Sequence, residues 1–232
     1  MEPTEKFDKK PKITVLICSL NEEENLPYVL PKIPAWVDEV ILVDGHSTDR
    51  TVETARELRP EIKVIYQPGN GKGDALKYGI QQANGEIIVT LDADGATNPQ
   101  EINEFIKPLL NGYDFAKGSR FHGRFPQHKP WHRVFGNIVI TVTFDLLFLR
   151  RYTDLCSGYN AFWKRVIAQI NLYSSDGFEN EPLINCRVGK EKLRVIEVGH
   201  ADKGRLNGEV KELSWRQGVK AIKTIIRERF RG

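Results

Sequence analysis

The stretch Ile87-Ile88-Val89-Thr90-Leu91-Asp92-Ala93-Asp94-Gly95 decides the fold. Its apolar, β-branched run predicts a strand buried on both faces, as in a parallel sheet covered by helices. Side chains alternate along a strand, so Asp92 and Asp94 are expected to point the same way where the strand ends. Two neighbouring carboxylates repel unless a cation lies between them, and Mg²⁺ prefers oxygen ligands and often bridges substrate phosphates. The prediction is a divalent metal site, and the alternative is an acidic, solvated turn.

Strand and helix patterns alternate on both sides of this stretch. Further strands are predicted at 12–19, 39–43, 62–66 and 113–117, and helices at 49–58, 74–83 and 98–110. Alternation with short connections predicts an α/β fold with a mostly parallel, doubly wound sheet flanked by helices. Ligands bind such sheets at the carboxyl ends of the strands. Three loops are expected at that edge, after Val43, around Lys72 and at Asp92–Asp94.

Beyond Gly118 the pattern changes to a loop crowded with basic and aromatic residues, followed mainly by helices. Helices are predicted over 134–149, from Lys164, from about 177–181 and over 213–230, with one more strand over 193–198. With no repeat and no convincing linker, we expect one domain over 12–232, preceded by a disordered lead-in over 1–11.

Composition and cysteine spacing narrow the class of protein. With 40% hydrophobic and 28% charged residues, the 232-residue chain is typical of one large soluble α/β domain. Its three cysteines are far apart and form no Cys-x-x-Cys, which argues against a disulfide scaffold or a zinc site and favours a reducing, cytoplasmic compartment. Because no run of 18 apolar residues occurs, we predict no membrane span.

Positive charge gathers near the C-terminus. Residues 203–232 contain nine Lys or Arg against three Glu, although the formal net charge of the whole chain is only +3. The predicted last helix places Trp215, Val219, Ile222 and Ile226 on one stripe, with basic residues on the other face. A basic patch suits phosphates, nucleic acid or an anionic membrane. The apolar stripe is expected to pack in the core, to form a homodimer interface or to lie peripherally on a membrane.

Several motifs occur in a fixed order along the chain. They are Asp44-Gly45-His46-Ser47-Thr48-Asp49, Asp92-Ala93-Asp94, Gly118-Ser119-Arg120-Phe121, Trp131-His132-Arg133 with Asn137, Asp154-x-x-Ser157-Gly158, Glu181, and Arg205-Leu206-Asn207-Gly208-Glu209-Val210-Lys211. In this order they resemble family 2 glycosyltransferases of the GT-A fold. The likeness is greatest to the polyprenyl-phosphate glycosyltransferases, the group that contains dolichyl-phosphate mannose synthase, and it extends from Lys12 to about Lys211.

This resemblance implies an activity and a role for each motif. A hexose would pass, with inversion, from a nucleotide-diphosphate sugar such as UDP-glucose or GDP-mannose to a polyprenyl phosphate. Residues 12–118 would hold the donor and 119–232 the acceptor. The donor-binding residues implied are Asn21, Glu22, Glu23, Asp44, Lys72, Asp92, Arg205 and Lys211. Asp92 and Asp94 would hold Mg²⁺ or Mn²⁺, and the groups at the reaction centre would be Arg120, Arg133, Asp154 and Glu181.

The chain departs from the family pattern in three places. Ala96 stands where members often carry Gln after the second metal Asp, which questions that metal contact, and Glu179 stands where many have Gln. Many members also carry transmembrane helices, so membrane contact here would be peripheral, at the cytoplasmic face.

Two other functions compete with this one. A sibling enzyme would glycosylate a hydroxyl group on a polysaccharide, protein or small metabolite, and it would need a general base, for which Asp154, Glu179 and Glu181 are candidates. A nucleotide- or nucleic-acid-binding module without turnover is more distant, because nucleic acid would have to approach the acidic metal edge. A dinucleotide oxidoreductase is disfavoured because no Gly-x-Gly-x-x-Gly follows the first strand.

Overall fold

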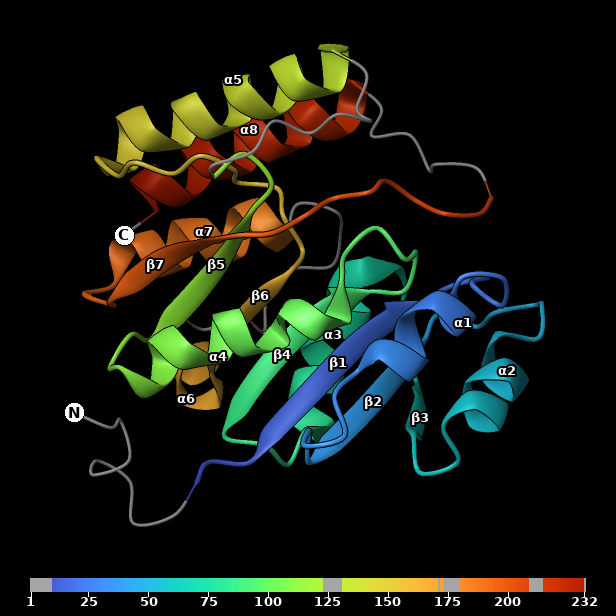
Figure 1. The fold of residues 1–232 in the computed structure, drawn as a ribbon. Coiled ribbons are helices and arrows are strands. Elements are labelled where there is room, and N and C mark those ends of the chain that lie inside the picture. Colours follow the sequence, from blue (N-terminus) through green and yellow to red (C-terminus); the bar gives the residue numbers. More distant parts are fainter. Residues whose placement is uncertain (1–9, 123–130, 171, 173–179, 209–214, 232) are drawn as a thin grey trace.

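The protein folds around one seven-stranded sheet (Figure 1). The computed structural model describes residues 10–122, 131–170, 172, 180–208 and 215–231. Residues 1–9 of the predicted lead-in therefore lie outside the described residues. The strands are β1 (Ile13–Ser19), β2 (Glu39–Asp44), β3 (Lys63–Tyr66), β4 (Ile87–Asp92), β5 (Phe115–Ser119), β6 (Asn160–Trp163) and β7 (Val195–Gly199), in the spatial order β3-β2-β1-β4-β6-β5-β7.

The first four strands form the parallel half of the sheet, as the sequence predicted. β1 lies at its centre, pairing in parallel with β2 and with β4, and β2 pairs in parallel with β3. β1 and β4 are buried along almost their whole length. This burial on both faces explains their continuous apolar sequences. The carboxyl ends of the four strands meet at one edge of the sheet.

The other half is mixed and contains an antiparallel strand, β6, that the sequence analysis did not predict. β6 lies between β4 and β5 and is antiparallel to both, while β7 pairs in parallel with β5. The predicted strand at 113–117 is present as β5, but it does not lie beside β4. The sequence analysis predicted no strand between the helix over 134–149 and the helix from Lys164. A strand of four residues is too short to show a period of two, so only its pairing with β4 and β5 defines it.

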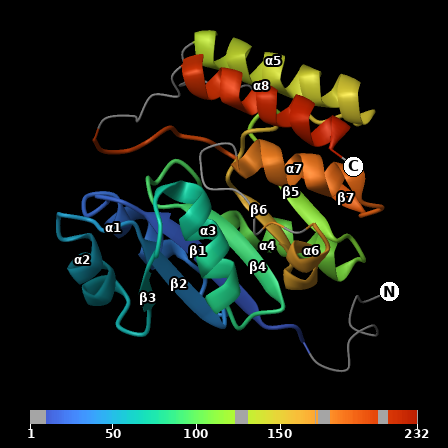
Figure 2. The same ribbon diagram turned by 180° about the vertical axis from the view of Figure 1, so that it is seen from behind.

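Helices cover both faces of the sheet, as a comparison of Figures 1 and 2 shows. On one face lie α1 (Leu26–Val29), the 3₁₀ helix η2 (Leu30–Lys32), α2 (Thr51–Leu58), the 3₁₀ helix η3 (Pro99–Glu101) and α4 (Ile102–Leu110). On the other lie α3 (Gly71–Gln82), α6 (Lys164–Gln169) and α7 (Asn180–Lys190). Each face encloses its own buried apolar cluster.

Two further helices pack beyond α7 rather than on the sheet. α5 (Trp131–Phe148) and α8 (Trp215–Phe230) lie side by side in both views, and a third apolar cluster, which includes Phe144, Cys186 and Ile225, joins them to α7. Within the described residues, no helix combines the length and the apolar character needed to span a bilayer.

Candidate active site

A cavity of about 360 Å³ opens where the four parallel strands end. Its lining includes residues at or just past each strand end, namely Ser19 and Leu20 for β1, Gly45 for β2, Gln67 for β3, and Asp92, Ala93 and Asp94 for β4. Open α/β sheets bind their ligands at this edge. Asp92 and Asp94 both line the cavity, as the alternation along the strand predicted.

Lys72 joins three of the predicted segments at this cavity. Its Nζ lies 2.6 Å from Asp92 Oδ1 and 2.8 Å from Glu181 Oε1. Gly158 closes over the pair, because a Cβ at that position would lie 2.8 Å from Lys72 Nζ. Burial alone would lower the pKa of Lys72, but the two carboxylates raise it well above its ordinary value. Lys72 therefore stays protonated between α3, β4 and α7.

Asp94 is a carboxylate whose ionised form is unfavourable. Its Oδ1 accepts a hydrogen bond from the backbone N–H of Ala96 at 3.0 Å. Burial, and then repulsion from Asp92, raise the pKa of Asp94 to about 6. A divalent cation between the two side chains would relieve this repulsion.

The residues present fit such a cation only in part. No group of three or more His, Cys, Asp or Glu side chains within the described residues is arranged to hold a metal. Asp92 and Asp94 would therefore supply the protein ligands, and a bound phosphate and water would complete the coordination. Mg²⁺ is typically bound in this way.

Arg120 and Asp154 form a second, more deeply buried ion pair. Arg120 Nε donates to Asp154 Oδ2 at 2.6 Å and Arg120 Nη2 to Oδ1 at 2.9 Å. Asn137 Nδ2 on α5 also donates to Oδ1, at 2.8 Å. Burial would raise the pKa of Asp154, but Arg120 holds it well below its ordinary range. Because both oxygens of Asp154 already accept hydrogen bonds, the geometry suits positioning Arg120 better than taking up a proton.

The third ion pair closes the cavity from the C-terminal side. Arg205 Nη1 and Nη2 each lie 2.8 Å from one oxygen of Glu22. Asn25 Nδ2 also donates to Glu22, at 2.8 Å. Within the described residues, the buried Arg205 Nε has no hydrogen-bond partner. This bidentate pair holds the segment after β7 against the loop after β1, and Arg205 itself lines the cavity.

Three predicted donor-binding residues stabilise a neighbouring turn. Asn21, Glu23 and Asp44 each accept a hydrogen bond of 2.7–2.9 Å from a backbone N–H group of residues 47–50. None of the three is among the residues that line the cavity. They shape the turn whose Gly45 does line it, and their contact with a donor stays a prediction.

The remaining predicted residues are placed less closely. Arg133 is partly exposed on α5, one turn before Asn137. Glu179, Lys211 and the basic residues of 123–130 lie outside the described residues.

Gln67 is a cavity residue that the sequence analysis missed. It is buried, and its Nε2 donates to the carbonyl oxygen of Gly69 at 3.0 Å. Gln67 could have been identified from the sequence because it directly follows the predicted parallel strand at 62–66. Cys18 also lines the cavity, where burial raises the pKa of its thiol to about 12.

Comparison with known proteins agrees with this geometry. Residues 14–170 match the model of the family described as "Glycosyl transferase family 2". The chain belongs to this family. The match includes β1 to β6 and therefore Lys72, Asp92, Asp94, Arg120 and Asp154.

Three relatives share this family's sequence features over most of the chain. Glycosyltransferase AglJ of Haloferax volcanii is 30% identical over 191 residues, 79% of this chain and 61% of the relative. Dolichol-phosphate mannosyltransferase of Pyrococcus furiosus is 30% identical over 210 residues, with coverages of 86% and 59%. Undecaprenyl-phosphate 4-deoxy-4-formamido-L-arabinose transferase of Proteus mirabilis is 27% identical over 209 residues, with coverages of 85% and 62%. The chain thus spans about three fifths of the length of these relatives.

A solved structure shows the same fold. Glucosyl-3-phosphoglycerate synthase from Mycobacterium tuberculosis, in complex with Mn²⁺, UDP-glucose and phosphoglyceric acid, superposes with a TM-score of 0.74 at 22% identity. The superposition covers 94% of this chain and 80% of that one. The predicted α/β fold of the GT-A type is therefore confirmed.

Proposed function

We propose that the protein transfers a hexose from a nucleotide-diphosphate sugar to a polyprenyl phosphate, with Mg²⁺ or Mn²⁺ as the cofactor. The donor class is supported by the cavity at the carboxyl ends of the parallel strands and by family membership. The acceptor class is supported by the dolichol-phosphate and undecaprenyl-phosphate transferases among its relatives.

On the donor side, the chain offers a charged cavity for a diphosphate. Asp92 and Asp94 would hold the divalent ion, which supplies charge neutralisation for the departing nucleoside diphosphate. Lys72 lies 2.6 Å from Asp92 and keeps that carboxylate ionised and in place. Arg205 adds a second cation to the cavity wall.

On the acceptor side, Arg120 is held rigidly by Asp154. A guanidinium fixed along one edge keeps its other N–H groups directed away from Asp154. Nη1 of Arg120 lies 3.8 Å from Asp202 Oδ2, and a phosphate would be a further anionic partner of this cation. A lipid phosphate is already an anion, so its attack needs positioning and charge neutralisation rather than a strong base. This agrees with Asp154 and Glu181 both being committed to ion pairs.

The two opposite sides of α5 support a lipid phosphate, rather than a hydroxyl group, as the acceptor. One side buries Asn137 against Asp154. The other exposes apolar side chains at helical spacing, namely Trp131 (79% exposed), Phe135, Ile138, Val142 and Leu146. A helix is about 10 Å across, so an apolar surface lies within one helix diameter of the fixed arginine. This arrangement supports a lipid acceptor, because a phosphate bound by Arg120 would lie close to an apolar surface.

The exposed residues of the neighbouring helix α8 favour a bilayer over a second protein chain as the partner of this surface. It exposes Trp215, Val219, Ile226 and Phe230 in one row. Beside that row lie four exposed basic residues, Arg216, Lys220, Lys223 and Arg227. Apolar side chains flanked by positive charge bind anionic lipid surfaces.

The test is direct. The protein is incubated with Mn²⁺, a panel of nucleotide sugars and a short-chain polyprenyl phosphate, and the products are read by mass spectrometry. A sugar-phosphate-lipid formed from one donor, and lost in Asp94→Ala with an unchanged circular dichroism spectrum, is the expected result. Lipid product retained by Asp94→Ala would contradict the metal role.

The same assay separates the competing acceptor class. Donor hydrolysis without lipid product, together with sugar found on a polysaccharide, protein or small metabolite, would select a hydroxyl acceptor. In that case Glu181 is the buried cavity-side carboxylate to test as the base, because it lies 2.8 Å from Lys72 beside the metal-binding strand.

A further inference from the structure

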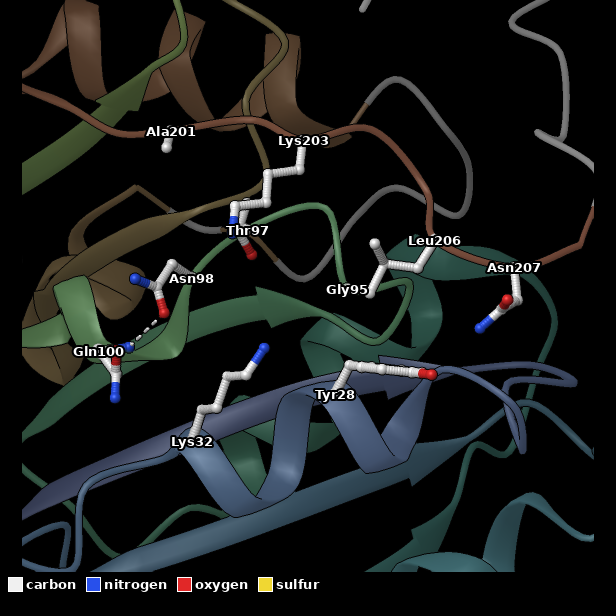
Figure 3. A pocket seen from close by; sticks show the side chains of 10 residues that line it. All are labelled: Tyr28, Lys32, Gly95, Thr97, Asn98, Gln100, Ala201, Lys203, Leu206 and Asn207. Carbon is white, nitrogen blue, oxygen red and sulfur yellow. Dashed lines mark hydrogen bonds between the residues drawn. The ribbon is translucent and has the colours of Figure 1, made fainter.

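A second pocket lies across the Asp94–Gly95 loop from the donor cavity (Figure 3). Its volume is about 510 Å³. It is formed by η2, by the loop after β4 and by the segment 201–207. We propose that this pocket binds a phosphate group, either free or as the ester of a small hydroxylated molecule. Binding at this pocket is separate from the proposed sugar transfer and does not depend on catalytic activity.

The charge of the lining points to an anion. Lys32 and Lys203 enter the pocket from opposite sides, and no Asp, Glu or His is among the lining residues (Figure 3). Both lysines are exposed, and within the described residues neither ammonium group forms an ion pair. Lys32 Nζ lies 6.0 Å from the ring centroid of Tyr28. A pocket with two positive charges and no carboxylate favours an anion over a neutral or cationic ligand.

The polar groups of the lining suit a phosphate ester in particular. Besides the lysines, the lining contains the Thr97 hydroxyl and the side-chain amides of Asn98 and Gln100. Asn98 Oδ1 accepts from the backbone N–H of Gln100 at 3.2 Å, so the Asn98 side chain is held in place. Ammonium and amide donors together bind phosphate oxygens, and hydroxyl and amide groups bind sugar or glycerol hydroxyls.

The wall between the two cavities is thin and held by backbone pairing. Leu206 N–H donates to the carbonyl oxygen of Asp94 at 3.1 Å, and Lys203 N–H to that of Ala96 at 2.9 Å. Gly95 has φ +75°, and a Cβ there would lie 2.5 Å from Leu206 Cδ1, so the two segments approach as closely as glycine allows. Gly95 and Leu206 line this pocket, whereas Asp94 and Arg205 line the donor cavity.

This shared wall gives the pocket a role. A ligand that bridges Lys32 and Lys203 fixes the segment 201–207 against η2 and thereby fixes Asp94 and Arg205 on the donor side. Binding in the two cavities is then coupled, and the coupling acts equally in both directions. Because the lining residues include no carboxylate or histidine, we assign this pocket a binding role and no chemistry.

The experiment titrates the full chain with inorganic phosphate, glycerol 3-phosphate and glycerol by isothermal calorimetry, without and with Mg²⁺ and UDP. The variant is Lys32→Gln combined with Lys203→Gln. Its control is Lys192→Gln, which removes an exposed lysine in the turn before β7. We expect saturable binding of the phosphates that weakens at least about tenfold in the double variant, since charge-assisted hydrogen bonds are the strong ones. The control should bind as the wild type does.

Comparing the titrations with glycerol 3-phosphate and inorganic phosphate also shows whether the pocket binds phosphate esters or free phosphate. Tighter binding of glycerol 3-phosphate than of inorganic phosphate would assign the pocket to esters, and equal binding would assign it to free phosphate. Equal affinity in the double variant and in Lys192→Gln, absence of saturation, or complete competition by Mg²⁺ and UDP would overturn the proposal. Because the readout is binding, failure of the glycosyl-transfer assay would leave this result unaffected.

Discussion

Two ion pairs near the donor cavity, Lys72–Asp92 and Arg120–Asp154, use different geometry. Lys72 contacts two carboxylates through one nitrogen, and the side chains of Lys72 and Asp92 are 26% and 35% exposed. Arg120 forms a two-pronged contact with the fully buried Asp154, and its Nη1 also lies 3.8 Å from Asp202 Oδ2. The first pair lies open to an incoming ligand, while the second is sealed by α5.

This difference indicates that the charge of Lys72 can exchange partners when a ligand binds, whereas the charge of Arg120 stays fixed on Asp154. An ammonium group is a point charge that can keep one partner when the other binds a metal ion. A guanidinium fork on a buried carboxylate is tied to one orientation. We therefore expect changes at the sealed pair to affect stability first, and changes at the open pair to affect ligand binding first.

Removing the sealed carboxylate should have the largest effect. Asp154→Ala leaves the guanidinium of Arg120 buried without its main partner. Breaking a buried pair from one side typically lowers the free energy of unfolding by about 3–5 kcal/mol. Urea denaturation followed by circular dichroism measures this loss. An unchanged denaturation midpoint would show that Asp154 does not anchor Arg120.

Exchanging lysine and arginine tests whether the two ion pairs depend on different geometry. Arg120→Lys replaces a fork by a single ammonium and should lower the free energy of unfolding by about 1–3 kcal/mol, the range of a lost hydrogen bond to a charged group. Lys72→Arg keeps a cation between Asp92 and Glu181 and should lower it less. Equal losses in the two variants would mean that both pairs are held in the same way.

Neutralising Asp94 should affect function without lowering stability. The pKa of Asp94 in the folded protein, about 6, lies above its ordinary value of 3.8, so its ionised form opposes folding. Wild-type stability should therefore gain a contribution as the pH falls through pH 6 towards pH 4 and lose it as the pH rises. Asp94→Asn should lack this contribution and be at least as stable as the wild type at pH 7 in metal-free buffer.

The functional arm uses the lipid-product assay with the same variant. Sugar transfer by Asp94→Asn should fall by roughly 100-fold or more, as on removal of an electrostatic group at a transferring centre. A variant that is less stable than the wild type at pH 7 would contradict the repulsion described for Asp92 and Asp94.

Changes on the exposed side of α5 should have the smallest effect on stability. Phe135 and Leu146 are 60% and 73% exposed, so Phe135→Ser with Leu146→Ser should shift the free energy of unfolding by no more than about 0.5 kcal/mol per site. Co-sedimentation with vesicles of phosphatidylcholine and phosphatidylglycerol should fall markedly. Leu58→Ser on α2 is the control and should sediment as the wild type does. Undiminished sedimentation of the double variant would exclude this surface as the membrane contact.

The parallel half of the fold and the position of the cavity could be predicted from the residues alone. Short, mostly apolar and β-branched runs such as 13–18 and 87–91 are typical of strands buried on both faces, and the polar residues that follow such strands lie at the carboxyl edge of the sheet. These patterns are local, because each can be recognised within a window of about ten residues. The placement of Asp92 and Asp94 on one cavity follows from alternation alone.

Tertiary structure alone decided how distant segments meet. β6 is defined by pairing with β4 and β5, and its four residues carry no period of their own. The contact of Lys72 with Glu181 and the pairing of Glu22 with Arg205, 183 positions apart, depend on how the helices pack on the sheet. A charged residue does not encode its partner, because many carboxylates along the chain satisfy the same cation equally well. The packed sheet and helices select one of them by bringing it within hydrogen-bond distance.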